Sequence, residues 1–73
     1  MHQERALFAA IKYFGSQSNL ARTLKISRKT VNKWLNRGDE IPFEYAIAIE
    51  KLTKGTVNRY ALAPYAKWLK ELY

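Results

Sequence analysis

The stretch that decides the fold is Gln17–Leu35, which reads QSNLARTLKISRKTVNKWL. Its apolar residues recur at helical spacing in two short runs that are separated by a turn. Ser16 precedes the first run and Ser27 lies directly before the second, and serine is a favoured residue at the N-cap of a helix. The stretch therefore predicts two consecutive helices, over Gln17–Leu24 and Arg28–Asn36.

The apolar positions of this stretch indicate how the two helices pack. Ala21 is small, as is needed where two helices cross at close range, and Ile26 fills the wedge between them. Val31 and Trp34 hold the second helix against the core. These side chains would be buried in any three-helix core, so they indicate a fold and say nothing about function.

The rest of the chain divides into further short segments. The spacing of apolar residues predicts a helix over Gln3–Phe14. Pro42 suits the first turn of another helix, which runs to about Thr53. Thr56–Leu62 is rich in β-formers but lacks a clean alternation, and we expect it to be extended. A last helix is predicted over Pro64–Leu72.

Length and composition restrict the class of protein. A chain of 73 residues permits one domain over 1–73, which we expect to be mainly α, with four to five helices and a short extended segment near 56–62. The hydrophobic share of 48% excludes a disordered tail. The absence of cysteine excludes a disulfide scaffold and a thiolate zinc site, and a single histidine, His2, cannot build a histidine metal site or a Ser-His-Asp triad.

Other features argue against a membrane protein and against an enzyme. No apolar stretch approaches the roughly 18 residues of a membrane span, and no signal-peptide pattern stands at the start, so we expect a cytoplasmic protein without a membrane partner. The acidic pair Asp39-Glu40 is better interpreted as the approach to a helix than as an acid–base couple. We expect no catalysis, no cofactor, no metal and no small-molecule substrate.

The formal net charge of +7 indicates a polyanionic partner, and this charge is unevenly distributed. From Arg5 through Gly38 the chain has eight basic residues and no acidic one. The eight are Arg5, Lys12, Arg22, Lys25, Arg28, Lys29, Lys33 and Arg37. A solvated charged face is the ordinary explanation of such a run. The absence of acids over more than 30 residues instead favours a surface that faces phosphates.

The two predicted helices and their turn resemble the helix-turn-helix of the Cro and lambda-repressor class of DNA-binding proteins. The resemblance extends over roughly residues 7–64 to the small phage Cro and YdaS-like regulators. Outside the motif it is carried by Gly15-Ser16-Gln17, Trp34-Leu35 with Gly38, Ile41-Pro42, Ala46, Ile49-Glu50, Thr53, Gly55, Val57, Arg59, Leu62 and Pro64. It implies a lambda-repressor-like domain in a bacterial or phage setting, acting as a repressor of transcription and associated with the nucleoid. Glu50 and Arg59 are expected to form a structural ion pair without a role in DNA binding.

One position departs from the general motif. The turn between the two helices usually holds glycine, because its backbone is left-handed there, and this chain has Lys25. A residue with a Cβ costs about 1–2 kcal/mol in that conformation. The departure concerns the geometry of the turn and not the fold, since Ile26 and Ser27 are in place.

The outward side of the second helix is predicted to read base edges in the major groove, because that groove admits one α-helix. It carries polar and basic side chains without the Glu–Lys pairs of an ordinary solvated helix. By resemblance and geometry, the residues that reach the bases are Ser27, Arg28, Lys29, Asn32 and Lys33. Arg28 and Lys29 suit guanine O6 and N7, and Asn32 suits adenine or a water-bridged edge. Thr30 either meets a thymine methyl group or faces inward.

A second group of residues is predicted to hold the DNA backbone. Gln17, at the start of the first of the two helices, would bind phosphate together with the backbone N–H groups of that turn. Arg22, Asn36 and Arg37 would flank the groove and contact phosphates, which position a protein on DNA without specifying a sequence.

The predicted partner is double-stranded DNA with a palindromic operator, bound by a weak homodimer that is completed on DNA. The C-terminal extension, 55–73, is the candidate dimerisation segment because it carries more apolar side chains than a small core can bury; the alternative is that it folds back as extra core. An antitoxin-like or other protein-interaction module is the competing function. RNA binding is disfavoured because the aromatic residues follow the apolar stripes and form no stacking sheet.

Overall fold

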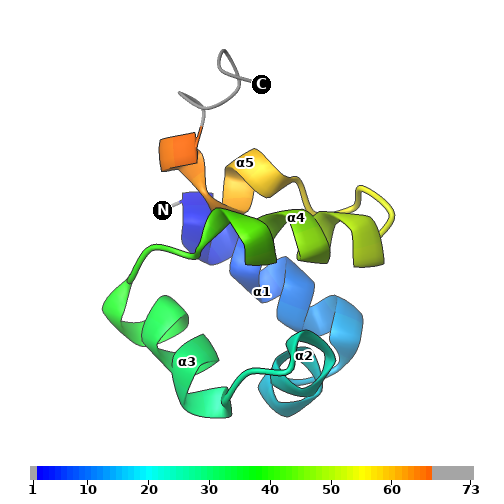
Figure 1. The fold of residues 1–73 in the computed structure, drawn as a ribbon, viewed down its shortest axis with the longest axis vertical. Helices are drawn as coiled ribbons and strands as arrows, with labels where there is room; N and C mark the ends of the chain where they lie inside the picture. Colours follow the sequence, from blue (N-terminus) through cyan, green and yellow to red (C-terminus); the bar gives the residue numbers. More distant parts are fainter. Residues whose placement is uncertain (1, 67–73) are drawn as a thin grey trace.

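The computed structural model describes residues 2–66, with His2 placed by its backbone alone. These residues form helices connected by short turns, and no strand occurs among them, which confirms the mainly α fold (Figure 1). In chain order the elements are α1 (His2–Phe14), α2 (Gln17–Leu24), α3 (Arg28–Asn32), a π-helical turn η1 (Lys33–Arg37), α4 (Phe43–Leu52) and α5 (Arg59–Leu62). Of the predicted last helix, Pro64–Leu72, residues 64–66 form a 3-10 turn and the rest lies outside the described residues.

The two serines act as N-caps, as predicted. Ser16 Oγ accepts a hydrogen bond from the backbone N of Asn19 at 3.1 Å, and Ser27 Oγ accepts one from the backbone N of Thr30 at 3.2 Å. Each bond satisfies a first-turn N–H group that has no partner within its own helix. The boundaries of α2 therefore agree with those predicted from the sequence.

The second predicted helix, Arg28–Asn36, is not one α-helix. It is α-helical to Asn32 and then widens into the π-helical turn η1, which ends at Gly38 in a left-handed conformation with φ 71°. Trp34 lies in this wider turn, is 4% exposed, and packs with its ring centroid 5.8 Å from that of Tyr45. The wider turn accommodates this large ring in the core, which residue spacing alone does not predict.

The expected extended segment Thr56–Leu62 is also wrong in its second half, which forms α5. Asn58 starts this helix, because its Oδ1 accepts a hydrogen bond from the backbone N of Tyr60 at 2.7 Å. Tertiary bonds to the neighbouring helix α4 outweigh the β propensity of the segment, which depends strongly on context.

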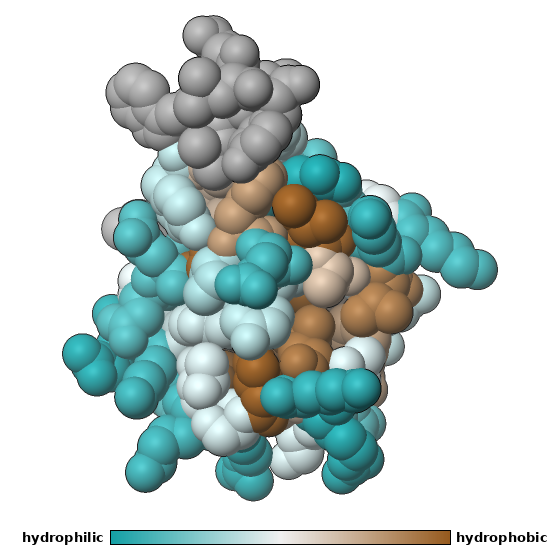
Figure 2. Space-filling view, in the orientation of Figure 1, coloured by the Kyte–Doolittle hydropathy of each residue, from teal (hydrophilic) through white to brown (hydrophobic). Residues whose placement is uncertain are grey.

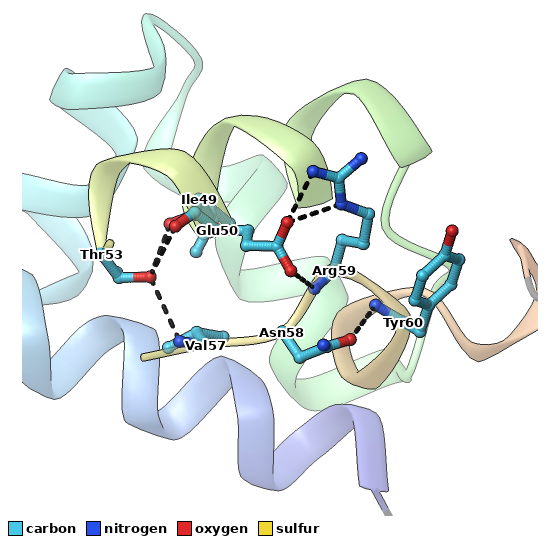
Figure 3. Close-up of polar contacts among 7 residues, drawn as sticks. All are labelled: Ile49, Glu50, Thr53, Val57, Asn58, Arg59 and Tyr60. Atoms are coloured by element: carbon cyan, nitrogen blue, oxygen red, sulfur yellow. Dashed lines mark hydrogen bonds and ion pairs between the residues drawn. The ribbon is translucent and has the colours of Figure 1, made fainter. Parts of the chain in front are cut away.

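Those tertiary bonds centre on the ion pair between Glu50 of α4 and Arg59 of α5 (Figure 3). Glu50 Oε1 lies 2.6 Å from both the Nε and the Nη2 atoms of Arg59, and Glu50 Oε2 accepts a bond from the Arg59 backbone N at 3.0 Å. Close by, the buried Thr53 hydroxyl donates to the Ile49 carbonyl at 2.8 Å and accepts from the Val57 backbone N at 3.2 Å. The expected structural ion pair is confirmed, and it connects the end of α4 to α5.

The core lies between α1 and the other helices. α1 packs against α2, η1 and α5, while α4 packs against α5. In Figure 1, α2 and α3 lie together at the lower end of the molecule, α4 crosses its middle, and α5 lies above. The fully buried large apolar side chains are Leu7, Leu20, Val31, Ile41, Ile49 and Leu62. The helix pair of α2 and α3 thus lies at one end of the molecule. Residues from throughout the described chain build the core.

The turn between α2 and α3 has the left-handed residue that the resemblance implies. Lys25 has φ 59° and ψ 41°, and its backbone N donates to the Arg22 carbonyl at 3.1 Å. The next N–H group, of Ile26, donates to the Ala21 carbonyl at 3.0 Å, which completes a Schellman motif. Lys54, after α4, is the second non-glycine residue with positive φ among those described, at 54°.

We expect Lys25→Gly to raise the free energy of unfolding by up to about 1 kcal/mol, because glycine has no Cβ penalty in the left-handed region. The greater freedom of glycine in the unfolded chain reduces the gain. Denaturant midpoints measure the change, with Lys25→Ala as the matched control, since alanine keeps the Cβ and should give no such gain. A clear loss of stability in Lys25→Gly would contradict the left-handed turn.

Candidate nucleic-acid interface

The helix pair is fixed by side chains on its inner faces. Ala21 of α2 and Val31 of α3 are 3% and 0% exposed, and Ile26 in the turn packs against the same core while half-buried. A small residue at the crossing lets α2 and α3 approach closely, as the sequence predicted. Because this face of α3 packs against the core, the opposite side of the helix faces solvent.

The structure places all five predicted base-reading residues in exposed positions, on α3, at its N-cap and at the start of η1. Arg28, Lys29, Asn32 and Lys33 are exposed, and so is Ser27. No acidic side chain lies among them. Ser27 is already engaged as the helix cap, so its hydroxyl supports α3 in addition to any contact with DNA.

Thr30 faces its own helix start. It is half-buried, and its hydroxyl lies 3.0 Å from Ser27 Oγ, in a single hydrogen bond in which either hydroxyl can be the donor. Of the two alternatives for Thr30, the structure therefore favours the one in which it turns away from the groove. Together with the backbone bond to Ser27, this hydroxyl pair stabilises the first turn of α3.

Asn32 and Asn36 are linked across one turn. The Nδ2 atom of Asn36 donates a hydrogen bond to Oδ1 of Asn32, and both side chains are exposed. The structure thus joins a residue predicted to read bases to one predicted to bind phosphate. An amide that is held by a neighbour loses less side-chain entropy when it binds a ligand.

The predicted phosphate contacts flank this face at both ends. Gln17 is half-buried in the first turn of α2, beside the Ser16 cap, and Arg22 is exposed further along the same helix. Arg37, at the end of η1, has its Nε 3.7 Å from Asp39 Oδ1, with side chains that are 67% and 40% exposed. An ion pair so exposed contributes little to stability, so Arg37 can exchange Asp39 for a phosphate.

Sequence reasoning missed the role of Asn19. Its Nδ2 donates to the carbonyl of Phe14, the last residue of α1, at 2.9 Å, and its Oδ1 accepts from Arg22 Nη1 at 3.3 Å. Asn19 therefore ties α2 to the end of α1 and orients one of the predicted phosphate contacts. Its position three residues after an N-cap serine was the available signal, although the capping-box residue there is usually Glu or Gln.

Hydrophilic side chains project from the lower end of the molecule, where α2 and α3 lie, as they do from its left and upper-right sides (Figure 2). Of the eight basic residues in the acid-free run, six lie on α2, α3, η1 or the turn between α2 and α3, so unbalanced positive charge is concentrated at this end of the chain's fold. Such a concentration of charge attracts a polyanion and raises its rate of association.

Within residues 2–66, no group of His, Asp and Glu side chains is placed to hold a metal ion. In the same part of the chain, no helix is long and apolar enough to cross a membrane.

Comparison with known proteins bears on this interface. A family model described as "Bacterial toxin YdaS" matches residues 7–71, which is most of the chain. The chain belongs to the YdaS family. A curated relative of this YdaS-family chain, named "Putative transcriptional regulator YdaS", comes from Escherichia coli strain K12 and is 39% identical over 54 residues. That match covers 74% of this chain and 55% of the relative, so the chain spans about half the length of the curated relative it matches.

No solved structure matches the YdaS-family chain. The two matches confirm the YdaS part of the resemblance and do not point specifically to the Cro or lambda-repressor part. One name describes a toxin and the other a regulator of transcription.

Proposed function

We propose that this YdaS-family chain is a sequence-specific, double-stranded DNA-binding regulator of transcription, of the repressor type, which reads the major groove with α3. The observation that carries the proposal is the exposed side of α3, which is polar and basic, free of acids, and presented by a capped helix pair. The name of the E. coli relative supports the same function.

In this proposal the two groups of residues divide the work. Arg28, Lys29 and Asn32, near the start of α3, hydrogen bond to base edges, and Ser27 and Lys33 lie beside them. Gln17, Arg22, Asn36 and Arg37 contact phosphates on either side of the groove. Because the capped turns fix α2 and α3 relative to each other, the phosphate contacts set the depth and register at which α3 enters the groove.

The family description, which names a toxin, gives weight to a second candidate, a module that binds another protein and contacts DNA only secondarily. Selection from random duplex DNA, followed by sequencing of the bound pool, separates the two. A DNA-reading protein enriches a defined site. A protein-binding module leaves the pool unchanged.

We expect Arg28→Ala, Lys29→Ala or Asn32→Ala each to weaken operator binding by about 1–3 kcal/mol and to relax the preference at one base pair. Arg22→Ala and Arg37→Ala should weaken binding to all sequences about equally, because phosphates carry no sequence information. A panel of operators with single base changes measures both effects. If the two groups of variants behaved alike, the assignment of α3 as the reading helix would be wrong.

A further inference from the structure

The outward side of α4 combines apolar side chains with opposite charges at its two ends. Glu44, Ile47, Ala48 and Lys51 are spaced i, i+3, i+4 and i+7, so they lie on one side of the helix. Leu52 extends this surface and is 44% exposed. We call these five residues the α4 face. In Figure 2, where α4 crosses the near side, apolar surface lies in the middle with hydrophilic side chains around it.

The α4 face contributes none of the fully buried side chains of the core. The opposite side of the helix supplies Ala46 and Ile49, which are both 0% exposed, and Phe43 and Tyr45 pack against the core from its edges. Among the described residues, the apolar members of the α4 face are absent from the core cluster and from the partly buried side chains packed on it. Ile47 and Ala48 are half-buried and Leu52 is 44% exposed, so part of the apolar surface of the α4 face remains available to a partner.

The charges indicate which partner. Glu44 and Lys51 are seven residues apart, about 10 Å along a helix, which is too far for an ion pair within one chain. In two antiparallel α4 helices related by a two-fold axis between positions 47 and 48, each Glu44 lies opposite the partner's Lys51. The same axis sets Ile47 against the partner's Ala48, a small residue that permits close approach. This surface is complementary to itself.

We propose that the α4 face, in place of the C-terminal extension 55–73 expected from the sequence, pairs two copies of this chain, with their α4 helices antiparallel. Within the described part of that extension, Val57, Leu62, Ala63 and Ala66 are buried in the chain's own core. A two-fold interface uses the same patch on both subunits, as this one does. A single pair of ten-residue helices is at the small end of protein interfaces, so we expect a dissociation constant of about micromolar or weaker. The net charge of +7 on each copy further opposes association in the absence of a polyanion.

The placement of α4 gives this pairing a consequence for DNA, which rests on the proposed function. In Figure 1, α4 runs across the long axis of the molecule, with α2 and α3 together at one end. A two-fold axis parallel to that long axis makes the α4 helices antiparallel and leaves both copies of α3 at the same end of the dimer. Two reading helices on one side of a dimer match a palindromic site.

Charge reversal tests the pairing without DNA. In sedimentation equilibrium at about 0.15 M salt, Glu44→Lys and Lys51→Glu should each weaken self-association about tenfold, since each creates like-charge pairs at both ends of the interface. An equimolar mixture of the two variants should recover the parent's association, because each end of the mixed dimer again sets one lysine against one glutamate. Glu4→Lys and Lys12→Glu, on the exposed side of α1, are the matched controls and should leave association unchanged.

A crosslink tests the same geometry on DNA. The chain has no cysteine, so Ala48→Cys introduces a single thiol next to the two-fold axis, and Ala9→Cys places one on the exposed side of α1 as the control. Ala48→Cys should form a disulfide-linked dimer on mild oxidation, more completely with a selected operator, while Ala9→Cys should not.

The outcomes separate this inference from the proposed function. DNA binding without an Ala48→Cys crosslink, or a dimer that ignores the charge reversals, overturns the α4 pairing and leaves the DNA-binding proposal standing. A charge-dependent dimer that selects no DNA site supports the pairing and contradicts the DNA-binding proposal.

Discussion

Raising the salt concentration from 50 to 200 mM should weaken binding of this chain to its selected operator by about 10³-fold or more. The reason is counterion release: about six to eight of the basic residues between Arg5 and Arg37 would each neutralise a phosphate, with a slope of about −0.9 per contact in log K against log salt. Two copies on one operator would double the slope. Fluorescence anisotropy at several salt concentrations measures it.

Single variants identify which cations contribute. Arg22→Gln should reduce the magnitude of the slope by about 0.9 for each copy bound, because one phosphate contact is lost. Lys54→Gln is the matched control, since Lys54 follows α4 and lies outside the predicted phosphate contacts, and it should leave the slope unchanged. A nearly flat salt dependence of the parent chain would rule out the DNA-binding proposal and favour a protein-binding module.

The second large effect concerns stability, and it comes from the ion pair between α4 and α5 (Figure 3). Arg59→Ala should lower the free energy of unfolding by about 2–3 kcal/mol, because it leaves a mostly buried carboxylate without its charged partner. The Glu50 side chain is only 19% exposed, so water replaces the lost bonds poorly. Arg37→Ala is the control: its pair with Asp39 is exposed and 3.7 Å long, and we expect a change below about 0.5 kcal/mol.

The same pair predicts how stability depends on pH. The pKa of Glu50 is lowered from its ordinary 4.5, first by the hydrogen bond from the Arg59 backbone N–H group and next by the Arg59 side chain. The folded chain therefore binds this proton less tightly than the unfolded chain does. Its contribution is fully present above about pH 4.5 and is lost as the pH falls through the lowered pKa. Glu50→Gln should flatten this acid limb of the stability curve; an unchanged limb would show that another group causes it.

The features that the sequence predicted correctly depend on interactions between residues that are close together in the chain. The sequence predicted both serine caps and the extent of α2, because Ser16 and Ser27 each bond to a backbone N–H group three residues further on. It also predicted that Ala21 and Val31 are buried, because the spacing of apolar residues along a helix is a local pattern. The π-helical turn around Trp34 was not predicted, and Trp34 contacts Tyr45 of another helix, which the spacing of residues along the chain does not reveal.

Bonds between two helices and the orientation of individual side chains explain what was missed elsewhere. α5 forms in a β-prone segment because Glu50, nine residues earlier, binds both the backbone and the side chain of Arg59. The bond between Asn36 and Asn32 depends on how two side chains orient across a turn, which composition does not reveal. The DNA-contacting roles of the candidate residues stay predictions, since exposure and charge make contact feasible without specifying a base.

The loop that follows the reading helix has a practical consequence for anyone who produces this protein. Gln3 Nε2 donates to the Asp39 carbonyl at 2.9 Å, and Tyr65 Oη donates to the Ile41 carbonyl at 2.7 Å. Side chains from near both ends of the described chain therefore bind the loop that follows η1. We therefore expect that a tag or fusion partner that displaces Gln3 or Tyr65 would loosen this loop, and with it the C-terminal end of η1. Cleavable tags, removed before binding is assayed, avoid this artefact.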